Sequence, residues 1–162
     1  MTGELRLREV EEADLPILFE HQLDAEANRM AAFTPKDPSD RDAFDRRWER
    51  IRADTRIPVR TIEVGGRVAG SVLVWVDEAL GRPEVSYWIG REFWGCGVAT
   101  RALHAFLDEV VTERPILARV AADNDASKRV LEKCGFVVRG SERGYANARG
   151  EEIEELILER TD

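Results

Sequence analysis

The segment Val98–Val111 constrains the fold more than any other part of this sequence. Apolar residues recur there every four positions from Val98 to Val110, with further apolar residues beside them. Such a wide apolar stripe predicts an amphipathic helix that packs against another layer of the structure. The preceding segment Glu84–Gly90, EVSYWIG, is rich in β-branched and aromatic residues and predicts a strand. Together they favour a sheet that is covered by helices.

The rest of the chain alternates between strand and helix patterns. The expected strands are Leu5–Val10, one on each side of the Gly65–Gly66 turn, Ile116–Ala122, and a pair that ends the chain. The further expected helices are one capped by Asp14, one capped by Ser39 or Asp40 with Phe44 and Trp48 as core residues, and a short one with Gly135 after its end. The order is β, α, α, β-β-β, α, β, α, β, β, which predicts one mixed α/β sheet in a single domain over residues 1–162.

The composition excludes several classes of protein. Apolar residues make up 43% and charged residues 35%, as in soluble globular proteins. No run approaches the ~18 apolar residues of a membrane helix, and the N-terminus does not resemble a signal peptide, so a cytoplasmic location is expected. The net charge is −8, and the sequence lacks the basic patch that is typical of nucleic-acid-binding proteins. Cys96 and Cys134 lack CxxC spacing and the chain has only 2 histidines, so no metal site is expected.

Two glycines, Gly95 and Gly97, stand just before the predicted helix. Glycine is favoured where the backbone turns tightly or approaches something closely. A glycine-rich approach to a helix N-terminus exposes N–H groups to an anion, often a pyrophosphate. A tight strand-to-helix turn without a ligand explains the same pattern. The stretch lacks the G-K-[ST] of a P-loop, and Thr100 stands where a dinucleotide-binding fingerprint has its third glycine.

Two blocks of the sequence resemble the GNAT superfamily of acetyl-CoA-dependent N-acetyltransferases, particularly the RimJ/RimL-like branch of ribosomal-protein N-terminal acetyltransferases. The block FWGCGVATRAL carries Gly97 and Ala99 of the pattern Gln/Arg-x-x-Gly-x-Gly/Ala, and Trp94 replaces Gln/Arg. That branch commonly has an aromatic residue there. The block NDASKRVLEKCGF, from Asn124 to Phe136, matches the branch's N-x-x-S…LEK-x-GF. The resemblance covers nearly the whole chain and implies the acyl-CoA N-acyltransferase fold, a mixed, mostly antiparallel sheet of about seven strands flanked by helices.

The resemblance also implies where acetyl-CoA binds as the co-substrate. It would lie in a V-shaped opening between two splayed strands, Glu84–Gly90 and Ile116–Ala122. Peptide groups of the first strand would bond the acetyl carbonyl and the pantetheine arm, and N–H groups at the helix start would hold the pyrophosphate. The implied cofactor-binding residues are Trp88, Ile89, Gly90, Trp94, Gly95, Cys96, Gly97, Val98, Ala99, Thr100, Asn124 and Ser127. Only peptide groups of the loop are needed, so the Cys96 side chain is expected to be a filler rather than a nucleophile.

The implied reaction is direct attack of a free amine on the thioester, which requires a general base. Glu84 is the first candidate, because relatives often have a glutamate at this position that acts through water. Strand alternation places Glu84, Ser86 and Trp88 on one face. A strand-end glutamate in solvent is the alternative, and Glu63 and Asp77 are further candidates.

The departing thiolate gains from a proton donor. Many relatives use a tyrosine seven residues after the asparagine, where this chain has Leu131. Ser127 is the branch's candidate donor, although a serine in the first turn of a helix is also an ordinary capping residue. Asn124 is a candidate helix cap as well as a pantetheine ligand. Tyr145 is a second candidate donor, with a loop aromatic that covers the core as the alternative.

By resemblance to the branch, the acceptor is a protein or peptide N-terminal amine. The alternatives are a small-molecule amine, such as an amino acid or antibiotic, and a CoA-binding module without catalysis. Phe33 and the AFTPKDP loop are expected in the acceptor wall. The acidic residues Glu151, Glu152, Glu154 and Glu155 are expected at a solvated strand edge, or as an attraction for a cationic substrate. A homodimer is compatible with the family.

Overall fold

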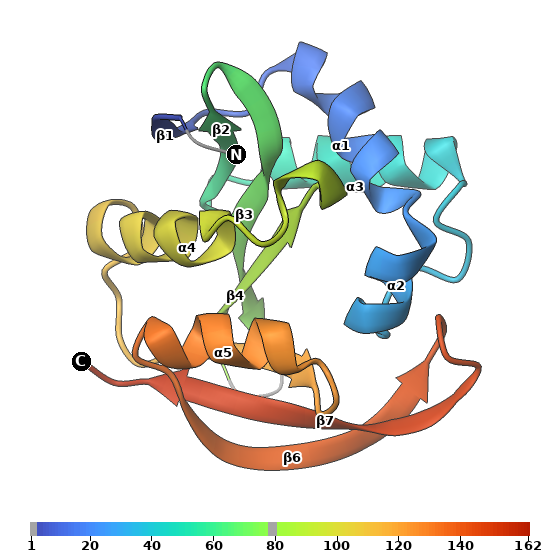
Figure 1. Cartoon of the computed structure of the whole chain (residues 1–162), viewed down its shortest axis with the longest axis vertical. Helices are drawn as coiled ribbons and strands as arrows, with labels where there is room; N and C mark the ends of the chain where they lie inside the picture. Colours follow the sequence, from blue (N-terminus) through green and yellow to red (C-terminus); the bar gives the residue numbers. More distant parts are fainter. Residues whose placement is uncertain (1–2, 78–80) are drawn as a thin grey trace.

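A computed structural model describes residues 3–77 and 81–162 of the chain, and for residue 77 the backbone alone (Figure 1). Within this part the strands are β1 (Leu5–Arg8), β2 (Val59–Val64), β3 (Arg67–Asp77), β4 (Arg82–Ile89), β5 (Ile116–Ala121), β6 (Val137–Ala146) and β7 (Glu151–Arg160). The α-helices are α1 (Leu15–Gln22), α2 (Ala25–Ala31), α3 (Arg41–Ala53), α4 (Val98–Glu109) and α5 (Asp125–Lys133). Short 3-10 turns, η1 (Glu12–Asp14) and η2 (Arg91–Phe93), precede α1 and follow β4.

The strands form one sheet in the order β1-β2-β3-β4-β5-β7-β6. All neighbours run antiparallel except β4 and β5, which are parallel. The mixed, mostly antiparallel sheet expected from the sequence is therefore confirmed. β4 and β5 are paired only where Glu84 lies opposite Leu117, whereas β5 pairs with β7 along its whole length. The sheet is thus split at the β4–β5 junction, where the two strands diverge.

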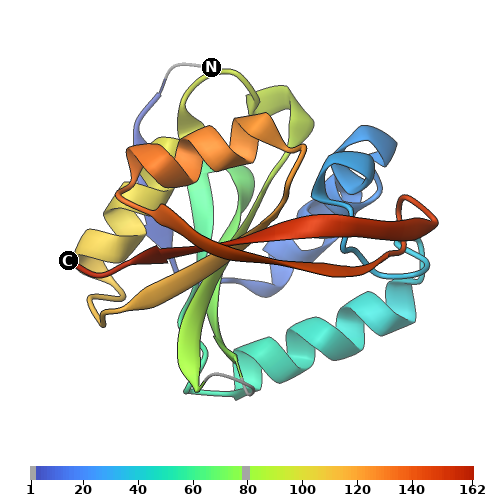
Figure 2. The ribbon, with the colours of Figure 1, turned by 90° about the horizontal axis from the view of Figure 1, so that it is seen from below.

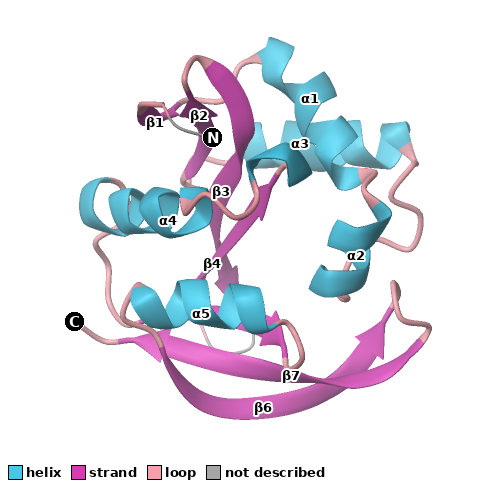
Figure 3. Ribbon diagram, in the orientation of Figure 1, coloured by secondary structure: helices cyan, strands magenta, loops and turns pink. Residues whose placement is uncertain are grey.

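Helices cover both faces of the sheet. Figure 2 shows α4 and α5 on one face and α3 on the other, and Figure 3 shows α5 alongside the long β6–β7 pair. The larger core lies under α4 and α5 and includes Phe93, Phe106 and Leu131. The smaller core lies between the sheet and α1 and α3, and it contains Phe44 and Trp48. The prediction that these two aromatic residues belong to the core is confirmed.

The predicted helices form largely where their periodicity placed them. In α4 the stripe expected to face the sheet is buried, and Phe106 and Leu107 have no exposed surface. The Asp40 side chain caps α3 by accepting a hydrogen bond from the Ala43 N–H at 3.0 Å. Helix α2 was not expected, and the Asp24 side chain caps it. Within residues 3–77 and 81–162, no helix has both the length and the apolar character needed to cross a bilayer.

The expectation that Asp14 caps α1 is wrong. Its carboxylate makes no cap hydrogen bond and is instead buried, where it accepts hydrogen bonds from Arg8 at 2.8 and 2.9 Å and from the Thr61 hydroxyl at 2.8 Å. Burial alone would raise the pKa of Asp14, but these partners and the Glu11 N–H hold that pKa below its ordinary value. Asp14 therefore joins β1, the start of α1 and β2, and its bond to Thr61, which is distant in sequence, is a contact that the local capping signal does not reveal.

Two expectations for the C-terminal strands are also wrong. Tyr145 was considered as a loop residue, but it lies in β6, which extends to Ala146, and 63% of its surface is exposed. The last strand, β7, is not an edge strand, because it lies between β5 and β6. Its acidic residues therefore differ from one another: Glu151, Glu152 and Glu154 are exposed, whereas Glu155 is partly buried. The order of strands in a sheet cannot be read from local pattern, which explains the error about β7.

Candidate active site

A cleft of about 660 Å³ opens where β4 and β5 diverge. It extends from the N-terminus of α4, past β4 and α5, to residues of α2, α3 and β7. The predicted site residues that line it are Glu84, Trp88, Ile89, Trp94, Gly95, Gly97, Val98, Ala99, Thr100, Asn124 and Ser127. Phe33 of the AFTPKDP loop also lines it, together with Thr34 and Pro35. The other two predicted site residues, Gly90 and Cys96, lie between members of this set in sequence but do not line the cleft.

The glycine loop before α4 has the backbone that glycine uniquely tolerates. Gly95 and Gly97 have φ angles of 75° and 74°, in the left-handed region. A Cβ atom added at either position would meet no atom within 4 Å, so the space in front of the loop is open. Helix α4 begins directly after Gly97, and its first-turn N–H groups have no acceptors within the helix. The loop and helix start therefore present N–H groups and the positive end of the helix dipole to the cleft.

The peptide groups of β4 divide between the sheet and the cleft. The Gly90 N–H donates to the Ala69 carbonyl at 2.8 Å, which directs it to β3. Because alternate residues of an antiparallel strand bond the same neighbour, the N–H groups of Tyr87 and Ile89 point away from β3, toward the opening. The Trp94 indole N–H donates to the Ile89 carbonyl at 2.9 Å. The end of β4 thus offers the Ile89 N–H, rather than that of Gly90, to a ligand.

The start of α5 is fixed by Asn124. Its side-chain oxygen accepts a hydrogen bond from the Ser127 N–H at 3.2 Å, as the expected N-cap. Its amide nitrogen donates to the Met30 carbonyl at 3.2 Å, which ties α5 to α2 across one side of the cleft. The cap prediction for Asn124 is therefore confirmed, and the Ser127 hydroxyl is not used for capping.

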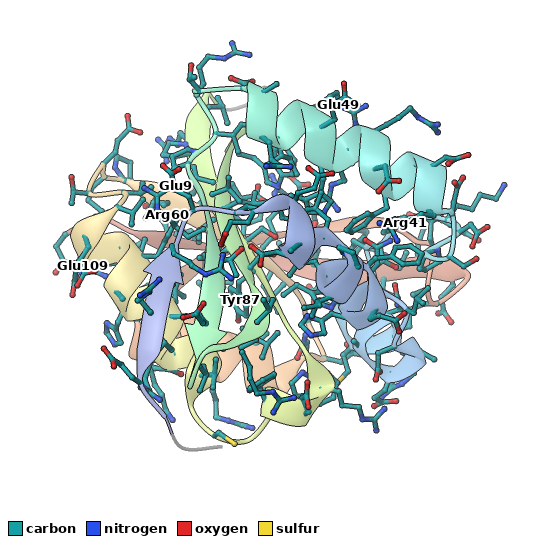
Figure 4. The ribbon with its side chains drawn as sticks, turned by 90° about the horizontal axis from the view of Figure 1, so that it is seen from above. Glu9, Arg41, Glu49, Arg60, Tyr87 and Glu109 are labelled. Carbon is teal, nitrogen blue, oxygen red and sulfur yellow. The ribbon has the colours of Figure 1, made fainter. Side chains whose placement is uncertain are left out.

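The Ser127 hydroxyl is hydrogen-bonded to a tyrosine that the sequence analysis did not single out. Its Oγ lies 2.6 Å from the phenol oxygen of Tyr87, which lies near the centre of the molecule (Figure 4). Burial raises the pKa of Tyr87 to about 12, although the bond to Ser127 lowers it, so the phenol stays protonated at neutral pH. Strand alternation could have revealed Tyr87, because it lies between Ser86 and Trp88 and so faces the opposite side of β4.

On the other face of β4, Glu84 belongs to a cluster of charges around Arg119. The Arg119 Nε lies 3.0 Å from a Glu84 carboxylate oxygen, and its Nη1 lies 3.2 Å from Glu142 and 3.6 Å from Glu155. Among the described residues, three carboxylates thus surround one guanidinium. Burial raises the pKa of Glu155, and the attraction of Arg119 only partly opposes this. Only 20% of the Glu84 side chain is exposed, so the alternative that Glu84 is a strand-end glutamate in solvent is wrong.

The remaining candidates lie elsewhere. Glu63 forms an ion pair with Arg8 at 2.7 Å and does not line the cleft. The Asp77 side chain is outside the described part of the structure. Cys96 donates its thiol to the Trp94 carbonyl at 3.4 Å. Among the described residues, no three His, Cys, Asp or Glu side chains gather in a way that could hold a metal ion.

Comparison with known proteins agrees with this geometry. The family described as "Acetyltransferase (GNAT) domain" matches residues 4–137. The uncharacterized N-acetyltransferase p20 of Bacillus licheniformis is 26% identical over 160 residues, which cover 94% of this chain and 90% of p20.

Solved structures show the same fold. RimL, a ribosomal L7/L12 alpha-N-protein acetyltransferase in complex with coenzyme A, superposes with a TM-score of 0.84 at 18% identity, over 99% of this chain and 95% of RimL. Spermidine N-acetyltransferase from Vibrio cholerae, in complex with CoA and spermine, superposes with a TM-score of 0.77 at 20% identity, over 96% of this chain and 95% of that one. With the family match spanning most of its length, this chain belongs to the GNAT family and is an N-acetyltransferase that uses acetyl-CoA.

Proposed function

We propose that this enzyme transfers the acetyl group of acetyl-CoA to the N-terminal amine of a protein or peptide. The observation that carries the proposal is the cleft between β4 and β5, where a helix start with exposed N–H groups, peptide N–H groups of β4 that point away from β3, and a charged cluster come together. We include in the proposal a single catalytic domain over residues 1–162 and a cytoplasmic location.

The glycine loop and the start of α4 are the proposed pyrophosphate site. N–H groups from Gly95 to Thr100 would donate to the phosphate oxygens, and the left-handed glycines keep side chains out of that space. The Ile89 N–H, at the end of β4, is the proposed donor to the pantetheine arm or to the acetyl oxygen. In that second role it would stabilise the negative charge that develops on the oxygen during attack.

Acetyl-CoA supplies an activated thioester carbonyl, and the enzyme must supply an unprotonated amine. We assign proton removal to Glu84, which lies on the acceptor face of β4 with Ser86 and Trp88. Within the described part of the chain, the three carboxylates around Arg119 outnumber it, and such an excess of negative charge favours an incoming ammonium group. Glu155, with its raised pKa, is the second carboxylate suited to accept a proton there.

Ser127 is the proposed donor to the departing thiolate. Its hydroxyl reaches the cleft, and the Tyr87 phenol beside it stays protonated. If Tyr87 donates to the Ser127 oxygen, Ser127 passes its own proton to the sulfur as it takes the Tyr87 proton, and the thiolate leaves as a thiol. The Tyr87 phenolate then recovers a proton from solvent, to which Glu84 releases the proton of the amine. The proton lost by the amine and the proton gained by the sulfur then balance. Tyr87 would occupy the role that the missing tyrosine at position 131 leaves open, although it acts through the serine.

The peptide acceptor rests on the resemblance to the RimJ/RimL-like branch, with which the superposition on RimL agrees. A small-molecule amine is the second candidate, because spermidine N-acetyltransferase has the same fold.

The first experiment is a calorimetric titration with acetyl-CoA, followed by thiol-release assays. The panel contains N-terminal peptides of ribosomal proteins, free amino acids, spermidine and aminoglycosides. We expect acetyl-CoA to bind and peptides to show the highest kcat/KM. No binding would refute the assignment of the cleft, and a higher kcat/KM on a small amine would refute the peptide acceptor. Binding without turnover on any amine would contradict the catalytic roles of Glu84 and Ser127.

A further inference from the structure

Arg47 is an arginine of α3 whose guanidinium faces the cleft rather than solvent. It is among the lining residues, and its guanidinium carbon lies 5.4 Å from the centre of the Trp75 ring. It follows the buried Phe44 by one helical turn and directly precedes the buried Trp48, so it stands at the border of the packed face of α3. This position holds the cation against the sheet and partly out of water.

Within the described residues, Arg47 forms no ion pair and no hydrogen bond with a carboxylate, and its charged neighbour is another cation, Arg50. The other arginines held near the sheet differ. Arg8 is paired with Asp14 and Glu63, and Arg119 with three glutamates. A partly buried cation without an anion carries a desolvation cost, and among the described residues the stacking on Trp75 partly offsets it.

The position of Trp75 places this cation beside the reaction centre. Trp75 of β3 lies directly opposite Glu84 of β4 in the sheet, so the two side chains share one face. Arg47 therefore covers the same face on which Glu84 and Trp88 approach the cleft, at the acceptor end rather than at the glycine loop. The face carries negative charge around Arg119 and an isolated positive charge at Arg47.

We propose that Arg47 binds a carboxylate of the acceptor, so that the preferred substrate is an amine bearing an anionic group close to the reacting nitrogen. This inference rests on the proposed function and narrows its substrate class. An acidic side chain near a peptide N-terminus and the free carboxylate of an amino acid share this chemistry. The planar guanidinium fork matches a carboxylate, and a desolvated site strengthens such a bond. A polyamine has no group for Arg47 and would leave it unpaired.

The test compares acceptors that differ only in charge. The peptide arm uses C-terminally amidated peptides beginning Ser-Asp and Ser-Asn, and the small-molecule arm uses L-methionine and L-methioninamide. We expect kcat/KM for the carboxylate member of at least one pair to exceed that of its amide by about 10- to 100-fold. The arm with the larger ratio identifies the source of the carboxylate.

Arg47→Met keeps the length and apolar stem of the side chain but removes the charge, and should abolish the preference by lowering only the rate for the carboxylate member. Arg47→Lys keeps the positive charge but lacks the planar guanidinium, so it should retain part of the preference for the carboxylate member. Arg46→Met is the matched control, because Arg46 is the exposed neighbour on α3 and its removal changes the net charge equally. Thermal unfolding of all three variants checks that the fold is retained.

The same pairs are titrated by calorimetry into the protein loaded with CoA, which measures acceptor binding without turnover. Failure of the proposed function would appear as absence of turnover on every amine. Failure of this inference would appear as equal affinities and equal kcat/KM within both pairs, as a preference that survives Arg47→Met, or as no binding of either anionic compound.

Discussion

Replacing Ser127 by alanine removes one of the two hydroxyl groups in the bond between α5 and β4. The Tyr87 phenol, which is half-buried in the wall of the cleft, is then left protonated and without the partner that lies 2.6 Å away in the wild-type protein. An unsatisfied buried donor costs about 1–3 kcal/mol. For a chain of this length, each kcal/mol lowers the melting temperature by roughly 2–4 °C. We therefore expect Ser127→Ala to lower the melting temperature by about 2–12 °C.

Adding Tyr87→Phe to Ser127→Ala should restore part of that loss, because the unpaired hydroxyl is removed. In the wild-type background, however, Tyr87→Phe breaks a satisfied bond and should cost about 1 kcal/mol. The same substitution is thus expected to destabilise one background and stabilise the other. This sign reversal distinguishes a direct bond between the two side chains from two independent packing effects.

The measurement is the thermal unfolding of four proteins, namely the wild type, the two single variants and the double variant. Unfolding is monitored by scanning calorimetry at pH 7 without ligand. Ser141→Ala is the matched control, since Ser141 is exposed on β6 and should leave the melting temperature unchanged. If Tyr87→Phe lowers the melting temperature equally in both backgrounds, the hydrogen bond carries no stability and the reasoning is refuted. The same set reports on catalysis. Loss of the proton donor in Ser127→Ala should lower kcat by about 100-fold, and loss of the positioning phenol in Tyr87→Phe by less.

Three further predictions concern the rest of the site. Gly97→Ala should weaken acetyl-CoA binding about tenfold or more in calorimetry. Gly66→Ala imposes the same left-handed strain in the β2–β3 turn and should leave the affinity unchanged. Equal losses of affinity in the two variants would contradict a phosphate site in the loop. Glu84→Gln should lower kcat by about 100-fold at unchanged acetyl-CoA affinity, and an unaltered kcat would transfer the role of base to Glu155. Because burial raises the pKa of Glu155, its charge costs stability once the pH rises above the ordinary range of a glutamate. Glu155→Gln should therefore raise the free energy of unfolding, measured in urea, at pH 7 but not below about pH 4. An increase of the same size at both pH values would contradict the raised pKa of Glu155.

Local pattern was sufficient for much of the fold and for the backbone of the glycine loop that we propose as the phosphate site. The α4 stripe, the Asp40 and Asn124 caps and the left-handed glycines each depend on residues within one or two helical turns. Properties that depend on distant partners could not be predicted in this way. Asp14 shows this for the fold, since its carboxylate pairs with Arg8 and bonds Thr61 rather than capping a helix.

The same limit applies to the candidate site. The two β4 side chains that differ most in chemistry, Glu84 and Tyr87, are three residues apart, and their partners Arg119 and Ser127 come from β5 and α5. Alternation along the strand indicates that they face opposite sides, but which helix or strand covers each side depends on strand order. Arg47 gives no signal in the sequence, because an arginine in an amphipathic helix is ordinarily solvated.

Because β4 and β5 are paired at a single position, the sheet consists of two parts. One part contains β1 to β4 and the other contains β5, β7 and β6, and the two share a core but almost no backbone pairing. An extended arm lying in the gap would act as a missing strand and connect the two parts. The free energy of unfolding should then increase as acetyl-CoA binds, and the strands beside the gap should become rigid only when the gap is filled. Amide hydrogens at the end of β4 would exchange with solvent slowly in the filled enzyme and rapidly in the empty one. If acetyl-CoA binds in the gap as proposed, the co-substrate would itself complete the sheet that binds it.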